Sequence, residues 1–172
     1  MLKAPAHLHS LEAILAVYPD AQIVHTYRCP LQVIPSLANL TFILKSAFSW
    51  KVDPLETGPS VLQYCLRNLR RFFGSRDRLQ TNCCTDVAYA DLVRDPISVV
   101  RQIYVSLGES LTSDAESRMM KFMSENPQAR WGRRVYSAAT FGLSTPAIEE
   151  QFRFYTERLR MTSRLSEVTS SK

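Results

Sequence analysis

The chain has 172 residues, of which 45% are hydrophobic and 22% charged, a composition typical of one globular domain and not of a disordered or low-complexity polypeptide. No apolar run approaches the roughly 18 residues of a membrane span and no signal-peptide pattern is visible, so we expect a cytoplasmic protein without a membrane partner. The net charge of +5 is spread evenly, with 9 basic and 6 acidic residues in 1–86 and 12 and 10 in 87–172, which argues against a nucleic-acid partner.

The four cysteines show no Cys-x-x-Cys spacing that would favour a tetrahedral metal site. They are Cys29, Cys65, Cys83 and Cys84. In a cytoplasmic chain we expect reduced thiols and no metal.

The first predicted elements are a helix, a strand and a second helix. Residues 10–18 place their apolar side chains on one helical face. Residues 21–27 are β-branched and aromatic, which predicts a strand. Pro30 ends this strand, because the residue before a proline avoids the α region. A helix with a broad apolar face is predicted over 31–47.

The middle of the chain predicts a loop, a basic helix and a second strand. Residues 50–60 are rich in Pro, Gly and polar residues, which indicates a loop. An amphipathic helix is predicted over 60–73 and a short strand over 84–89.

Three further helices are predicted by their end signals. Asp95-Pro96 is a strong helix start, and Gly108 closes that helix. The segment Ser113–Glu116 has capping-box spacing before a helix that runs to about 124. Residues 125–145 look irregular, and Thr145-Pro146 opens a last helix that carries apolar residues to Leu159.

Alternation of strands and helices predicts an α/β fold with a parallel sheet flanked by helices. We expect one domain over residues 1–165 and a frayed tail over 166–172. Two strands are few for such a domain, which suggests a fold that is helix-rich and incomplete.

The segment from the first strand into the next helix carries the most informative pair of residues. Ligands of α/β sheets bind beyond the carboxyl ends of strands, where helix N-termini offer free N–H groups. Arg28 ends the strand and Ser36 lies eight residues later in the helix. Together they could bind an anion through a guanidinium fork and a hydroxyl.

At these residues the chain resembles the sulfotransferase family, over residues 1 to about 163. The run from Leu2 to Leu40 carries the resemblance, which implies a P-loop NTPase-like fold and the co-substrate 3′-phosphoadenosine 5′-phosphosulfate (PAPS). It implies that Arg28 and Ser36 bind the 3′-phosphate. The family has Asp or Asn where this chain has Cys29, which puts the usual side-chain capping of the turn in doubt.

Two later segments extend the resemblance. Residues 87–96, VAYADLVRDP, place Tyr89 where the family has a tyrosine near the adenine. Residues 125–137 resemble the basic loop that closes over the co-substrate, and Val135 replaces a basic residue there. The resemblance implies that this loop binds the co-substrate through Arg130, Arg133 and Arg134.

The candidate catalytic residues are Lys3 and His7, close to the N-terminus of the chain. In the family this region lies beside the reacting sulfuryl group, which implies a charge-balancing role for Lys3 and a general-base role for His7. An ordinary polar residue at a helix start is the competing interpretation of His7. His25, which alternates within a strand, is expected to be a packed or hydrogen-bonded histidine.

One family feature is missing from the sequence. Family members begin with a strand and a Gly-containing loop that binds the 5′-phosphosulfate through backbone N–H groups. The five glycines, at 58, 74, 108, 132 and 142, do not form such a loop. We therefore expect an N-terminally incomplete fold, low activity of this chain alone, and possible self-association through exposed sheet edges.

The resulting functional hypothesis is transfer of a sulfuryl group from PAPS to a hydroxyl or amine of a small-molecule or glycan-like acceptor. The alternative is a non-catalytic nucleotide-binding or interaction remnant of a sulfotransferase.

Two clusters receive structural interpretations: a solvated helix face and a buried core. The first comprises Arg67, Arg70, Arg71, Arg76 and Arg78, and the second Met119, Met120, Phe122 and Met123. Trp131 could pack on a nucleotide or anchor its loop.

Overall fold

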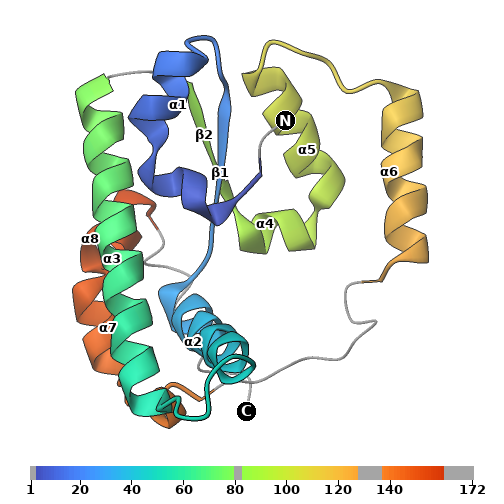
Figure 1. The fold of residues 1–172 in the computed structure, drawn as a ribbon. Coiled ribbons are helices and arrows are strands. Elements are labelled where there is room, and N and C mark those ends of the chain that lie inside the picture. The colour runs from blue at the N-terminus through green and yellow to red at the C-terminus, as the bar shows by residue number, and fades with distance from the viewer. Residues whose placement is uncertain (1–2, 80–82, 128–136, 161–172) are drawn as a thin grey trace. The chain divides into compact units, whose positions relative to one another are not determined.

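The computed structural model describes residues 3–79, 83–127 and 137–160. The chain divides into two compact units. We call residues 15–28 with 81–135 the sheet unit, and residues 1–14, 29–80 and 136–172 the helical unit. Figure 1 shows the elements of each unit as a ribbon.

The sheet unit is built on two parallel strands. β1 (Ile23–Tyr27) pairs with β2 (Cys84–Ala88), in a register that runs from Ile23 opposite Cys84 to Tyr27 opposite Ala88. Both predicted strands are confirmed, with shorter ends. Tyr89 is not the last strand residue but begins α4 (Tyr89–Arg94), a short helix that the residue pattern did not predict.

The next helix of the sheet unit begins and ends where its signals predict. α5 spans Pro96–Ser106, and the Asp95 carboxylate accepts a hydrogen bond from the Ser98 N–H at 3.1 Å. Gly108 adopts a φ of +75°, a left-handed conformation that favours glycine after a helix. The predicted helix start and stop are both confirmed.

α6 (Ser113–Glu125) begins as predicted but uses a different cap. The hydroxyl of Thr112, not Ser113, accepts a hydrogen bond from the Ala115 N–H at 3.3 Å. The predicted capping box is therefore wrong by one residue. Glu116 pairs instead with Arg101 at 2.7 Å, which links α6 to α5.

The N-terminal part of the chain forms η1 (Pro5–His9), a 3₁₀ helix, followed by α1 (Leu11–Val17). Two long helices follow in the helical unit. α2 spans Pro30–Ser46 and α3 spans Pro54–Leu79, and they pack against each other. These bounds confirm helices at 10–18 and 31–47 and extend the predicted helix at 60–73 in both directions.

The predicted loop at 50–60 is confirmed only over residues 50–53 and is wrong beyond them, because α3 already begins at Pro54. The carboxylate of Asp53 accepts a hydrogen bond from the Leu55 N–H at 2.7 Å, which satisfies one of the free donors at the helix start. Gly58 is buried, and a Cβ there would lie 2.0 Å from the Phe141 carbonyl oxygen. Close backbone packing therefore requires a glycine within this helix.

The last predicted helix is interrupted. After η2 (Ala139–Phe141), the chain forms α7 (Thr145–Gln151) and α8 (Arg153–Arg158). The break lies at Phe152, which is 1% exposed, so burial of this ring coincides with the interruption. The predicted frayed tail at 166–172 lies outside the described residues.

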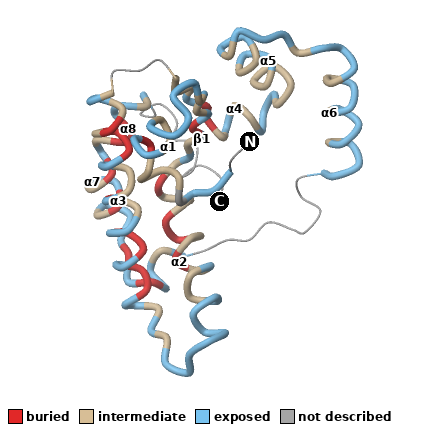
Figure 2. The backbone as a smooth tube through the Cα atoms, turned by 45° about the horizontal axis from the view of Figure 1, so that its top comes forward, coloured by how far each residue is buried: buried red, intermediate tan, exposed pale blue. Residues whose placement is uncertain are grey.

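The core of the helical unit lies where α3 packs against α2 and η2, where α2 packs against α7, and where Phe73 of α3 contacts aromatic rings of α8. Figure 2 shows buried residues along α3 and α2. Large buried side chains include Ile34, Phe72, Phe73, Ile148 and Phe152.

The predicted core role of the methionine-rich segment of α6 is wrong for two members. Met120 is 55% exposed and Phe122 66% exposed.

Candidate functional site

Arg28 and Tyr89 follow the carboxyl ends of the two paired strands. Tyr27 and Ala88 are opposite each other at the ends of β1 and β2, and Arg28 and Tyr89 are the residues that follow them. The guanidinium carbon of Arg28 lies 4.5 Å from the centroid of the Tyr89 ring, within the range of a cation–π interaction. The exposed Arg28 side chain and the half-buried Tyr89 ring therefore form one structural pair.

The turn after Arg28 starts a helix without a side-chain cap. Cys29 occupies the N-cap position of α2 and its side chain makes no cap hydrogen bond. Its carbonyl oxygen accepts hydrogen bonds from the N–H groups of Gln32 at 3.0 Å and Val33 at 3.1 Å. Pro30 supplies the first helical residue, where its missing N–H costs nothing. The expected loss of side-chain capping at this turn is confirmed.

A polar pair of one buried and one partly exposed residue lies three residues before Arg28 and Tyr89. The Nδ1–H of His25 donates a hydrogen bond to Asp86 Oδ1 at 2.8 Å, and the two residues are register partners. His25 is 8% exposed, so the predicted hydrogen-bonded histidine is confirmed. A register shift would separate the two side chains, so this pair favours the register that sets Arg28 beside Tyr89.

Ser36 lies in α2 and is half-buried, six residues after the first residue of that helix. Arg28 ends the strand of the sheet unit, whereas Ser36 belongs to the helical unit. Joint binding of one phosphate by these two residues stays a prediction from their spacing.

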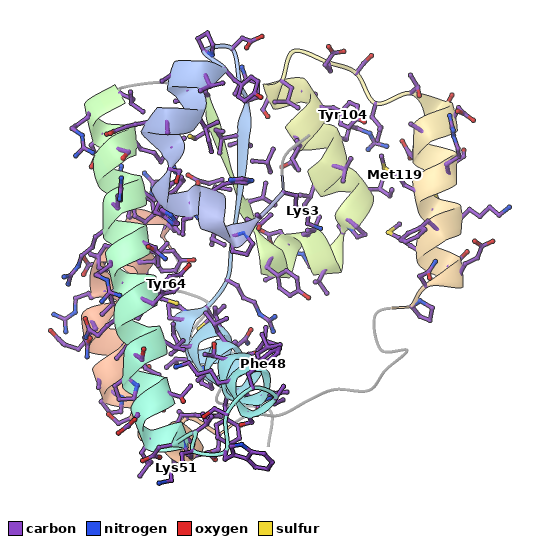
Figure 3. The ribbon with its side chains drawn as sticks, viewed as in Figure 1. Lys3, Phe48, Lys51, Tyr64, Tyr104 and Met119 are labelled. Carbon is purple, nitrogen blue, oxygen red and sulfur yellow. The ribbon has the colours of Figure 1, made fainter. Side chains whose placement is uncertain are left out.

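Lys3 and His7 lie on the N-terminal segment of the helical unit, where Figure 3 labels Lys3. Lys3 is exposed in an extended segment, and His7 is half-buried in η1. The backbone around His7 is fixed by two turns, since its N–H donates to the Ala4 carbonyl at 3.1 Å and its carbonyl accepts from Ser10 at 3.0 Å. Their catalytic roles stay predictions.

His9 is the more unusual of the two histidines in η1. Its Nδ1 is buried and has no hydrogen-bond partner in the part of the chain that the structure describes. Sequence reasoning singled out His7 and gave no reason to separate it from His9.

The three arginines of the predicted basic loop, Arg130, Arg133 and Arg134, lie outside the described residues, as does Trp131.

The arginines of α3 mostly serve structural contacts. Arg78 donates to the Glu12 carboxylate at 2.5 Å, and this hydrogen bond is the main reason that the pKa of Glu12 lies below its usual value. Arg158 pairs with Asp77 and lowers the pKa of that carboxyl in the same way. Arg70 and Arg76 lie over phenylalanine rings. The structural interpretation of this cluster fits these contacts better than a nucleic-acid surface does.

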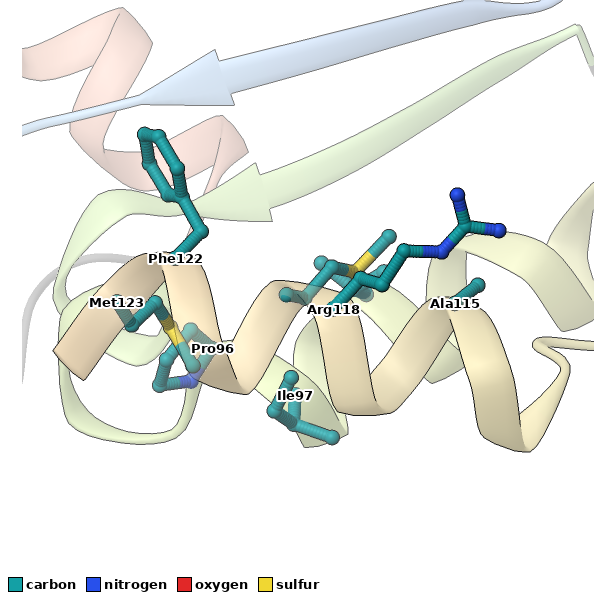
Figure 4. A pocket seen from close by; sticks show the side chains of 8 residues that line it. Pro96, Ile97, Ala115, Arg118, Phe122 and Met123 are labelled. Carbon is teal, nitrogen blue, oxygen red and sulfur yellow. The ribbon is translucent and has the colours of Figure 1, made fainter. Parts of the chain in front are cut away.

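An apolar groove of about 450 Å³ lies between α5 and α6 in the sheet unit (Figure 4). Most of its lining is apolar: Pro96, Ile97, Val100, Ala115, Met119, Phe122 and Met123. Arg118 also lines it, extends its guanidinium away from the apolar side chains, and pairs with Asp114. Sequence reasoning missed this groove because it assigned the same α6 residues to a closed core.

Within residues 3–79, 83–127 and 137–160, no cluster of three or more His, Cys, Asp or Glu side chains is arranged to hold a metal ion. None of the helices in these ranges is both long and apolar enough to cross a membrane.

Comparison with known proteins identifies the family. A family model described as "Sulfotransferase family" matches residues 1–114 of the chain. The chain belongs to the sulfotransferase family. A curated relative, the omega-hydroxy-beta-dihydromenaquinone-9 sulfotransferase Stf3 of Mycobacterium bovis, is 26% identical over 109 residues, which are 63% of this chain and 28% of that protein. The same enzyme of Mycobacterium tuberculosis matches equally.

Solved sulfotransferase structures share the fold. The structure of STF9 from Mycobacterium avium matches 91% of this chain and 41% of its own with a TM-score of 0.82 and 30% identity. STF1 from Mycobacterium tuberculosis matches 88% of this chain and 38% of its own, with a TM-score of 0.73 and 31% identity. The predicted helix-rich α/β, P-loop-like sulfotransferase fold is confirmed, and the chain spans about two fifths of these solved relatives.

Proposed function

We propose that this sulfotransferase-family chain forms the 3′-phosphate-binding part of a site for PAPS. The observation that carries the proposal is the Arg28–Tyr89 pair at the carboxyl ends of adjacent parallel strands, where α/β folds bind ligands. An exposed guanidinium offers a fork of N–H donors suited to phosphate oxygens. Arg28 also lies two residues before α2, and a helix N-terminus favours an anion.

The proposed reaction transfers a sulfuryl group in line from PAPS to an acceptor hydroxyl. A bond forms between the acceptor oxygen and sulfur while the bond between sulfur and the 5′-phosphate oxygen breaks, and adenosine 3′,5′-bisphosphate leaves. The acceptor proton passes to a base, for which we propose His7. Lys3 would balance the charge of the transferred group. Catalysis of this kind depends on positioning and charge stabilisation, and no resident metal is proposed.

The acceptor class follows from the curated relatives, which are named for an omega-hydroxy menaquinone derivative. We propose a hydroxyl group of a small molecule as the acceptor of the present protein. A glycan hydroxyl and an amine are less favoured acceptors, since the name of these relatives gives a hydroxyl of a menaquinone derivative.

Two measurements on the purified 172-residue chain test this proposal. The first is calorimetric titration with adenosine 3′,5′-bisphosphate, for which we expect saturable binding. The second is transfer from radiolabelled PAPS to a panel of hydroxyl acceptors. We expect no measurable transfer by this chain alone, because none of its glycines stands in the sequence pattern expected for the loop that binds the 5′-phosphosulfate.

Binding tests the 3′-phosphate site, and transfer tests whether this chain alone also binds the 5′-phosphosulfate. Binding without transfer supports the 3′-phosphate site and is also the result expected of a non-catalytic nucleotide-binding remnant. Transfer at about 1 per second or faster would show that unrecognised residues bind the 5′-phosphosulfate. Absence of binding would contradict the proposed function.

A further inference from the structure

The Arg28 guanidinium contacts one face of the Tyr89 ring. Their separation of 4.5 Å places the cation over one face of the ring. Both residues are the first beyond their paired strands, so the strand register holds their backbones side by side. Tyr89 also begins α4, which fixes its backbone on the following side.

This contact addresses a physical difficulty of an exposed arginine. A long, exposed side chain samples many rotamers, and it must lose that freedom when it binds a phosphate. A ring that holds the guanidinium plane restricts those rotamers before the ligand arrives. Because the N–H donors of a guanidinium lie in its plane, a ring that contacts the face of that plane does not itself occupy them.

We propose that Tyr89 is a positioning residue that pre-organises Arg28 for the 3′-phosphate. The inference rests on the proposed function and deepens it. One face of the Tyr89 ring contacts Arg28 and is therefore not used by the nucleotide base. A nucleotide base could then use the opposite face or the edge of the ring. By positioning Arg28, Tyr89 should increase the preference of the site for a nucleotide that carries a 3′-phosphate.

The experiment compares two nucleotides that differ in that group. Adenosine 3′,5′-bisphosphate and adenosine 5′-monophosphate are titrated into the 172-residue chain and into the variants Tyr89→Leu and Tyr89→Phe. Loss of the ring should reduce the preference for the bisphosphate about 3- to 10-fold, since it removes the cation–π contact. Tyr89→Phe keeps the ring and should keep the preference within about 2-fold.

Tyr104→Leu is the matched control. Tyr104 lies in α5 of the same unit, and the same substitution there should leave the preference unchanged. Tyr89 variants that lose affinity for both nucleotides by the same factor would overturn the inference, because a ring that contacts only the base affects both equally.

A ligand-free measurement separates this inference from the proposed function. In proton NMR spectra the Arg28 side-chain resonances should be shifted upfield by the Tyr89 ring current. The shift should persist in Tyr89→Phe and disappear in Tyr89→Leu. Failure of the unsubstituted chain to bind either nucleotide would contradict the proposed function, and the ring-current shift would then decide the positioning role by itself: its absence overturns that role.

Discussion

His25 and Asp86 face each other across β1 and β2 and share a hydrogen bond of 2.8 Å between His25 Nδ1 and Asp86 Oδ1. The imidazole is 8% exposed, whereas the Asp86 side chain is 30% exposed. A polar pair at one register position favours that register over its neighbours, because a shift would leave a buried imidazole without this carboxylate. The same register brings Arg28 beside Tyr89.

Replacement of Asp86 by alanine should destabilise the fold by about 1–3 kcal/mol, because the buried His25 ring loses a hydrogen-bond acceptor. Asp86→Asn keeps an acceptor oxygen and should cost less. The free energy of unfolding from urea titration measures both effects. Asp20→Ala removes the same charge from an exposed turn and should change stability by less than about 0.5 kcal/mol. Equal effects of Asp86→Ala and Asp20→Ala would contradict the structural role of the pair.

Gly58→Ala should destabilise the chain although the glycine lies within a helix. A Cβ at this position would lie 2.0 Å from the Phe141 carbonyl oxygen, so the backbone must shift, at a cost of about 1–3 kcal/mol. Gly74→Ala is the control in the same helix, because its Cβ would approach no more closely than 3.4 Å to the flexible Arg78 side chain. That change should stabilise by about 0.5–1 kcal/mol. Thermal unfolding that shifts the same way for both variants would refute the close approach.

Cys65 should resist alkylation in the folded chain. Burial raises the pKa of its thiol to about 11 from 9.0, which lowers its thiolate fraction at pH 8 about 100-fold. Because the folded pKa is the higher one, the stability linked to Cys65 is complete below about pH 9 and declines as the pH rises toward 11. Iodoacetamide labelling followed by mass spectrometry should modify Cys65 only after unfolding in urea. The alkaline decline should be smaller in Cys65→Ala, and rapid labelling of the native, half-buried thiol would contradict its raised pKa.

Ser36→Ala should weaken binding of adenosine 3′,5′-bisphosphate by about 10- to 100-fold, the loss expected for one hydrogen bond to a charged group. Ser46→Ala, at the end of the same helix, serves as the control and should leave the affinity unchanged. Titration calorimetry measures both. Indistinguishable affinities of the two variants would remove Ser36 from the phosphate site.

Elements with local end signals could be predicted from the sequence. Asp95 and Gly108 delimit α5 because a cap and a left-handed residue depend on few neighbours. α3 could not be predicted in its first turns, because Gly58 and Pro59 are poor helix formers. Burial and the contact with Phe141 outweigh that preference, and such a tertiary contact leaves no local pattern.

The site shows the same division. Arg28 and Tyr89 could each be identified from strand-end segments that resemble the family, but their mutual contact required the register between residues 61 positions apart, as in the pair of His25 and Asp86. A register between two separate strands is not encoded in either strand alone. The signal that could have found the contact is that both residues directly follow predicted parallel strands.

The most direct test of the account is the dependence of 3′-phosphate recognition on Arg28. Adenosine 3′,5′-bisphosphate is titrated into the unsubstituted chain, into Arg28→Ala, and into Arg94→Ala, which removes an exposed arginine of α4 that pairs with Asp91. One charge-assisted contact is worth about 1.5–3 kcal/mol, so Arg28→Ala should bind about 10- to 100-fold more weakly while Arg94→Ala binds as the unsubstituted chain does. Equal affinities of all three proteins would contradict a 3′-phosphate site at Arg28.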